Sequence, residues 1–214
     1  MDSQKMDRFN FLSPEEIKAP EGCPTGHLEL DQFLISKGLP KGGLSALCGD
    51  KGLGATSLWL QMAQRITAKK SHVAWIENKT EHINPWALKK FEIPLSQFFW
   101  ISPPKDLRQK LWVLSELCSL DFFESIACPL EGEYLKDRQL LQLRKLARLH
   151  QVAVVFFTTH AWSHHELEVS LHFQKDHIRI LRARHRPTPH LLERSFFHAH
   201  TLSEFAPERK ALRG

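Results

Sequence analysis

A glycine-rich segment between two apolar segments constrains the fold of this chain more than any other feature. Residues 44–48 are apolar enough for a buried strand, and residues 54–68 carry apolar side chains at helical spacing. The glycines between them, in residues 49–54, permit the backbone conformations that a tight connection needs. The sequence therefore predicts a strand, a short loop and a helix in direct succession.

The loop has the spacing of a phosphate-binding motif, G-x-x-x-x-G-K-[ST], with Ala55 at the lysine position. In such motifs backbone N–H groups and a helix N-terminus surround a phosphate, while the lysine neutralises the terminal phosphates. Ala55 carries no charge, which argues against ordinary ATPase chemistry. Lys51 is an alternative source of charge and would allow residual binding of ATP with Mg²⁺. The altered loop comprises Gly49, Lys51, Gly52, Gly54, Ala55, Thr56 and Ser57.

The composition is that of a folded protein in a reducing compartment. Hydrophobic residues make up 42% and charged residues 25% of the chain. The four cysteines show no C-x-x-C spacing, so we expect buried free thiols. No segment resembles a signal peptide or a transmembrane helix, and we expect a cytoplasmic protein without a membrane partner. The formal net charge of +5 favours an anionic partner.

Strand and helix patterns alternate along the chain until about residue 157. The predicted strands in this part are 44–48, 72–77, 98–101, 120–126 and 152–157. Strands that alternate with helices favour an α/β fold with a mostly parallel sheet flanked by helices.

The pattern changes after residue 160. Residues 167–173, 178–183 and 191–198 predict antiparallel strands added at the C-terminal edge of the sheet. We accordingly divide the chain into an N-terminal segment (1–21), a core (22–200) and a basic C-terminal tail (201–214).

Taken in order, these elements resemble the RecA family over residues 22–200. Thr25-Gly26-His27-Leu28-Glu29-Leu30-Asp31 is similar to the T-G-x-x-x-L-D entry of that family, and Gly38-Leu39-Pro40-Lys41-Gly42 to its G-x-P-x-G approach to the phosphate-binding loop. Residues 140–155 resemble its long helix and following central strand, and residues 182–187 its late basic turn. The resemblance implies a RecA-like core.

The resemblance also implies which positions would carry catalysis. Lys79 stands near the position of the catalytic glutamate, and His160 at the position of the sensor glutamine. Glu124 matches the Walker B aspartate that closes the third strand of the family. Because phosphoryl transfer depends on placed positive charge and an oriented water, these changes imply a protein that is not an enzyme and has no cofactor.

Among RecA-like proteins, the chain resembles the ImuA family most. That resemblance implies a cytoplasmic accessory protein of DNA damage-induced mutagenesis, within the SOS response and translesion synthesis. The implied partners are a Y-family polymerase homologue, an error-prone polymerase and RecA, with DNA as a further partner. Two alternatives remain open: a SulA-like inhibitor of cell division and a weak DNA-stimulated ATPase.

Two clusters of polar residues are candidate binding sites. Arg182, Arg184 and Arg186 alternate along a predicted strand and turn, and with Arg209, Lys210 and Arg213 they form the candidate nucleic-acid contact. The alternative is a charged edge strand that discourages aggregation. His160, His164, His165 and Glu166 are metal-ligating residue types, but they follow a strand as a loop, and we expect no metal there.

Overall fold

The structure, a computed structural model, describes residues 21–77, 83–102, 104, 106–130 and 132–193. The strands are β1 (Gly22–Cys23), β2 (Leu39–Pro40), β3 (Leu44–Cys48), β4 (His72–Ile76), β5 (Phe98–Ile101), β6 (Phe123–Pro129), β7 (Ala153–Thr158), β8 (Val169–Phe173), β9 (His177–Ala183) and β10 (His190–Glu193). The helices are α1 (Leu28–Phe33), α2 (Ala55–Ala68), α3 (Pro85–Lys90), the 3₁₀ helix η1 (Leu95–Gln97), α4 (Leu107–Ser119) and α5 (Asp137–His150).

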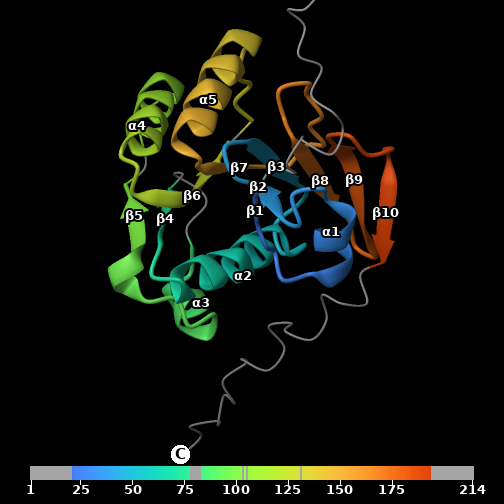
Figure 1. The fold of residues 1–214 in the computed structure, drawn as a ribbon, viewed down its shortest axis with the longest axis horizontal. Helices are drawn as coiled ribbons and strands as arrows, with labels where there is room; N and C mark the ends of the chain where they lie inside the picture. The colour runs from blue at the N-terminus through green and yellow to red at the C-terminus, as the bar shows by residue number, and fades with distance from the viewer. Residues whose placement is uncertain (1–20, 78–82, 103, 105, 131, 194–214) are drawn as a thin grey trace, which may run out of the picture.

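A mixed sheet with helices on both faces forms the centre of the molecule (Figure 1). Its eight strands follow the order β10-β9-β8-β3-β7-β6-β4-β5, and β1 and β2 form a separate two-stranded antiparallel sheet. The six strands from β8 to β5 in this order are parallel to one another, so the carboxyl ends of β3, β6 and β7 meet at one edge. The expected α/β fold with a mostly parallel sheet is confirmed.

Two apolar clusters, one on each face of the sheet, hold the helices in place. Helices α1, α2 and α3 cover one face of the sheet, and α4 and α5 cover the other (Figure 1). Strand β3 contributes Leu47 to the first cluster and Ala46 to the second, because successive side chains of a strand point to opposite faces. Strands covered on both faces are expected to be largely apolar, as β3 and β7 are, with Ser45 and Thr158 as their polar residues.

The C-terminal strands differ from the prediction in one respect. Strands β9 and β10 are antiparallel, as expected, but β8 pairs with β3 in the parallel sense. The preceding segment, residues 159–168, returns the chain to the opposite edge of the sheet, where the Glu168 N–H donates to the Leu44 carbonyl at 2.8 Å. Alternation of polar and apolar residues marks a strand but carries no information on its direction. Residues 194–198 of the third predicted strand lie outside the described residues.

Strand β6 begins and ends three residues later than predicted. It spans Phe123–Pro129, where the sequence pattern indicated 120–126. Leu120 and Phe122 are exposed, and between them Asp121 has a left-handed backbone, with φ of 48°. The apolar residues at 120 and 122 belong to a turn, and this shift changes the interpretation of Glu124.

All four cysteines are buried and free, as predicted. Burial raises the pKa of the Cys118 thiol to about 12 and acts in the same direction on the others. Among the residues that the structure describes, no helix is long and apolar enough to cross a membrane.

Candidate functional site

The predicted strand–loop–helix unit is present at the carboxyl edge of the sheet. The loop leaves β3 at Gly49 and enters α2 after Gly54, and both glycines have left-handed φ values, 138° and 96°. A Cβ atom on Gly49 would lie 2.6 Å from the Phe173 carbonyl oxygen, so its backbone fits only glycine there. The Gly49 N–H donates to the Thr158 carbonyl at 2.9 Å, which fixes the start of the loop to the end of β7.

The loop leads into a helix N-terminus without a competing cap. Gly54 is the N-cap residue, so no side chain caps α2, and its first turn carries no acidic residue. Thr56 and Ser57 are exposed at this end. The first N–H groups of a helix lack partners within that helix and favour an anion, so this arrangement has the backbone elements of a phosphate site.

The position that would carry the lysine has a packing role instead. Ala55 is half-buried and, together with Leu53, packs against the apolar cluster beneath α2. The site therefore combines the backbone of a phosphate-binding loop with an uncharged side chain at its first helical position. Lys51 is exposed within the loop.

Glu124 does not lie near this loop, and its predicted place at the close of the third strand is wrong. It is the second residue of β6, one position before Ser125, which is level with Ala153 at the start of β7. The opposite end of β6, where a Walker B carboxylate is required, consists of Cys128 and Pro129. The prediction failed because the strand was placed three residues too early.

At the amino edge of the sheet, Glu124 belongs to an ion-pair network around Lys41. The Lys41 ammonium lies 2.9 Å from Glu124 Oε1 and 2.8 Å from Glu21 Oε1. Burial opposes the charge of Lys41, but hydrogen bonds to these two carboxylates raise its pKa above the usual range. The hydrogen bond from Lys41 lowers the pKa of Glu21. Burial and the nearby Glu124 charge raise the pKa of Cys23 to about 12. This network joins β6 to the segments at β1 and β2.

Two further positions, His160 and Lys79, were predicted to be altered catalytic positions. His160 is exposed two residues beyond β7, at the same edge as the loop, and its N–H donates to the Thr158 hydroxyl at 3.1 Å. The structure thus places His160 near the loop. Lys79 lies outside the described residues.

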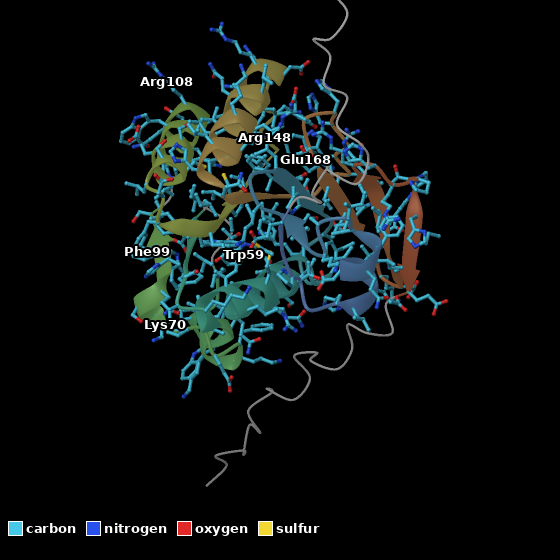
Figure 2. All side chains as sticks on the ribbon, in the orientation of Figure 1. Trp59, Lys70, Phe99, Arg108, Arg148 and Glu168 are labelled. Carbon is cyan, nitrogen blue, oxygen red and sulfur yellow. The ribbon has the colours of Figure 1, made fainter. Side chains whose placement is uncertain are left out.

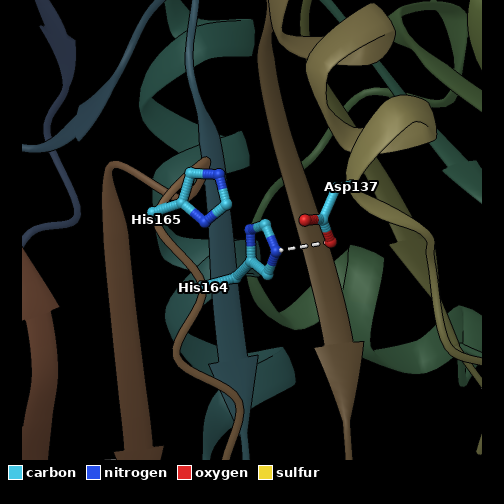
Figure 3. A group of neighbouring side chains, drawn as sticks. All are labelled: Asp137, His164 and His165. Carbon is cyan, nitrogen blue, oxygen red and sulfur yellow. Dashed lines mark hydrogen bonds and ion pairs between the residues drawn. The ribbon is translucent and has the colours of Figure 1, made fainter.

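Two of the metal-ligating residue types noted in the sequence, for which no metal was expected, lie together in the structure (Figure 3). His164 and His165 lie beside Asp137, the first residue of α5, and the metal-ligating atoms of the three side chains lie within 4.8 Å of one another. His160 is not part of this group. The Glu166 N–H donates to His164 Nδ1 at 3.1 Å, so a neutral His164 carries its proton on Nε2 and donates it to Asp137 Oδ1 at 3.2 Å. A metal ion on Nε2 would displace the hydrogen bond to Asp137 and move the proton to Nδ1, where it would face the Glu166 N–H, so the contacts fit a hydrogen-bonded pair of His164 and Asp137 better than a metal site.

Glu166 itself faces a different partner. Its carboxylate is largely buried and lies 2.5 Å from the Arg144 guanidinium of α5. Together with the His164 contact, this pair holds the segment 159–168 alongside α5.

The arginine row at the end of β9 is not a free surface. Strand β9 ends at Ala183, so Arg184 and Arg186 lie in the following turn and do not continue a strand face. Arg182 donates to the Leu167 and His165 carbonyls at 2.5 and 3.1 Å. Arg184 pairs with Glu168 at 2.5 Å, and Arg186 donates to the Phe33 carbonyl at 2.9 Å. Each guanidinium therefore has a partner within the chain. Arg209, Lys210 and Arg213 lie outside the described residues.

The sequence analysis missed one buried ion pair near the carboxyl end of β6. The Lys110 ammonium, on α4, lies 2.5 Å from Glu133 Oε2 and donates to the Pro129 carbonyl at 3.2 Å. Lys110 is only 5% exposed. It occupies the apolar stripe of its helix, three residues after Leu107 and four before Leu114, and this spacing was a usable signal.

Comparison with models of protein families and with curated protein sequences finds no match to this chain.

Proposed function

We propose that this chain is a non-catalytic, RecA-like accessory protein of the DNA damage response and translesion synthesis. It acts by binding partner proteins, with DNA as a further partner. The partners proposed are a Y-family polymerase homologue, an error-prone polymerase and RecA, and the proposed compartment is the cytoplasm.

The RecA-like assignment draws on the order of motifs in the sequence and on the position of the glycine-rich loop. Strand β3 lies inside a parallel sheet, between β7 and β8, and its loop leads into α2. Ligands of open α/β sheets bind outside the carboxyl ends of the strands, where this loop lies.

The non-catalytic assignment is carried by the loop itself. Its glycines have the positive φ values that a tight turn into a helix needs, whereas Ala55 supplies packing in place of positive charge. The end of β6 supports the same conclusion, because Cys128 and Pro129 offer no carboxylate to hold Mg²⁺. A site without either group lacks the charges that stabilise phosphoryl transfer.

A titration of the purified protein with ATP and Mg²⁺, with and without single-stranded DNA, tests this proposal. We expect no saturable binding at micromolar nucleotide and no release of phosphate. Tight binding that depends on Mg²⁺ would instead favour the weak DNA-stimulated ATPase.

A pull-down with the full chain tests the partner role. Retention of RecA or of a mutagenesis polymerase from purified components is the expected outcome. Retention of a cell-division protein alone would favour the SulA-like alternative and overturn the proposal.

A further inference from the structure

We propose that the solvent face of α5 is a binding surface for single-stranded nucleic acid, which it holds through phosphate contacts and base stacking. The inference deepens the proposed function, on which it rests for a nucleic-acid partner, and it replaces the arginine row of β9 as the contact surface.

The first observation is the uneven charge of α5. Residues 137–150 contain the cations Arg138, Arg144, Lys145 and Arg148, and their one acidic residue is Asp137. The apolar residues Leu140, Leu143 and Ala147 are buried against the sheet, so the cations lie on the remaining surface of the helix.

The cations of α5 differ in whether their side chains have a partner within the chain. Arg144 is paired with Glu166, and Asp137 is occupied by His164. Among the described residues, by contrast, no ion pair or hydrogen bond engages the side chains of Arg138, Lys145 and Arg148, and all three are exposed. These three residues are called the α5 cations below.

The α5 cations form a line on a rigid support. Residues three and seven positions apart lie on one side of a helix, which groups Lys145 with both Arg138 and Arg148. At a rise of about 1.5 Å per residue the line is about 15 Å long, comparable to about four steps of a nucleic-acid strand at about 3.4 Å each.

The surroundings of Arg148 concentrate its charge further. Arg148 lines a cavity of about 400 Å³ whose lining also includes the carboxylates of Glu168 and Glu21 and the cations Arg184 and Lys41. Glu21 is already paired with Lys41 at 2.8 Å. Glu168 is already paired with Arg184, so it does not neutralise Arg148. The positive charge at the C-terminal end of α5 is therefore available to an external anion.

An exposed aromatic residue lies at the other end of the line. Tyr134 precedes α5 by three residues and is 78% exposed. Tyr134 stands four positions before Arg138 in the sequence. An exposed aromatic ring together with a row of cations is the combination by which proteins hold single strands, since bases stack on the ring while phosphates contact the cations.

Other partners fit this surface less well. The apolar face of α5 is buried in the core, so the helix has no apolar side to insert into a membrane. Interfaces between proteins have cores depleted in charged residues, whereas Leu149 is the one exposed large apolar residue of α5. A nucleic-acid strand requires charge and one stacking ring, both of which are present.

Fluorescence anisotropy with a labelled oligothymidine longer than about 16 nucleotides measures this binding, in the absence of ATP and over a range of salt concentrations. The test variant carries Arg138→Gln, Lys145→Gln and Arg148→Gln. The matched control removes three positive charges elsewhere, through Lys69→Gln, Lys70→Gln and Lys89→Gln. Lys70 follows α2, on the other face of the sheet from Arg148 of α5 (Figure 2).

We expect the test variant to have an affinity for the oligothymidine at least about tenfold lower than that of the unmodified protein. The slope of log affinity against log salt should fall by about 2, since each lost phosphate contact removes about 0.7. Tyr134→Leu should weaken binding by roughly fivefold or more at unchanged salt dependence. The control should retain most of the affinity, and circular dichroism should show that all variants fold.

Equal losses in the test variant and the control would overturn the proposal, as would absence of binding at low salt. The proposal would also be overturned if the affinity for polyglutamate or for duplex DNA equalled the affinity for oligothymidine. These results are independent of the ATP titration, because tight ATP binding would refute the non-catalytic role and leave the α5 result unchanged.

Discussion

Lys41 and Glu124 form an ion pair of 2.9 Å at the amino edge of the sheet, opposite the glycine-rich loop. Their side chains are only 18% and 15% exposed, so removal of Glu124 leaves the Lys41 charge with little access to water and with Glu21 as its remaining carboxylate. We expect Glu124→Gln to lower the free energy of unfolding by about 1–3 kcal/mol.

Urea unfolding measures that change. The double variant Lys41→Met, Glu124→Gln should lose less stability than the sum of the two single variants, because neither charge is then left alone. Nucleotide titrations of Glu124→Gln serve as the control. A large change in Mg²⁺-dependent ATP binding with unaltered stability would restore a Walker B role to this residue.

The loop provides a second prediction. Because Gly49, Gly52 and Gly54 keep left-handed conformations, the backbone remains suited to an anion, and Ala55 is the position that lacks charge. We expect Ala55→Lys to raise the affinity for ATP about tenfold or more, with no gain in hydrolysis, because a positive charge close to the phosphates favours binding.

Isothermal titration with ATP and Mg²⁺ checks this outcome, and Ser57→Lys is the matched control because it adds the same charge to an exposed neighbouring position. If both variants gained the same affinity for ATP, the gain would come from added positive charge in general and not from the position of Ala55. Hydrolysis by Ala55→Lys would contradict the absence of the remaining catalytic groups.

The buried thiols predict a loss of stability at alkaline pH. Burial raises the pKa of Cys23, Cys118 and Cys128 to about 12, from a usual value near 9. Between these values the unfolded chain releases the thiol proton while the folded chain keeps it. The folded state therefore binds more protons, and the free energy of unfolding falls as the pH rises from about 9 to about 12.

Urea unfolding at a series of pH values measures this slope, and Cys118→Ala should reduce it by removing one of the titrating groups. Cys118 is chosen because its pKa shift has burial as its one cause. If the free energy of unfolding fell equally steeply with pH in the unmodified protein and in Cys118→Ala, the loss of stability could not be assigned to the thiols.

The sequence indicated the elements of this fold better than their exact positions. The apolar residues 44–48 and the glycines after them were sufficient for β3 and its loop, because local geometry determines both. The exact position of β6 could not be predicted from a local sequence pattern. Phe122 lies outside the strand yet stacks on His72, with ring centroids 3.9 Å apart, and a local pattern does not distinguish such a contact from a strand residue.

The candidate sites depended even more on contacts distant in sequence. The alternation of Arg182, Arg184 and Arg186 predicted a nucleic-acid contact but gave no sign of their partners, which include Phe33, 153 positions from Arg186. For α5 the resemblance indicated a long helix but not the partners of its cations. Which of its cations are paired depends on the segment 159–168 lying beside it, and that arrangement has no local signal.

The contacts of Arg182 lead to a last prediction, which separates stability from nucleic-acid binding. Its guanidinium donates to the Leu167 and His165 carbonyls and so holds the segment before β8 against β9. We expect Arg182→Gln to lower the free energy of unfolding by about 1–3 kcal/mol, because hydrogen bonds from a charged group are lost and two carbonyls lose their donor. At temperatures where it remains folded, this variant should keep the full affinity for oligothymidine. Urea unfolding and fluorescence anisotropy on the same preparation distinguish the two effects. A variant of full stability that binds the oligonucleotide tenfold more weakly would return the contact surface to β9.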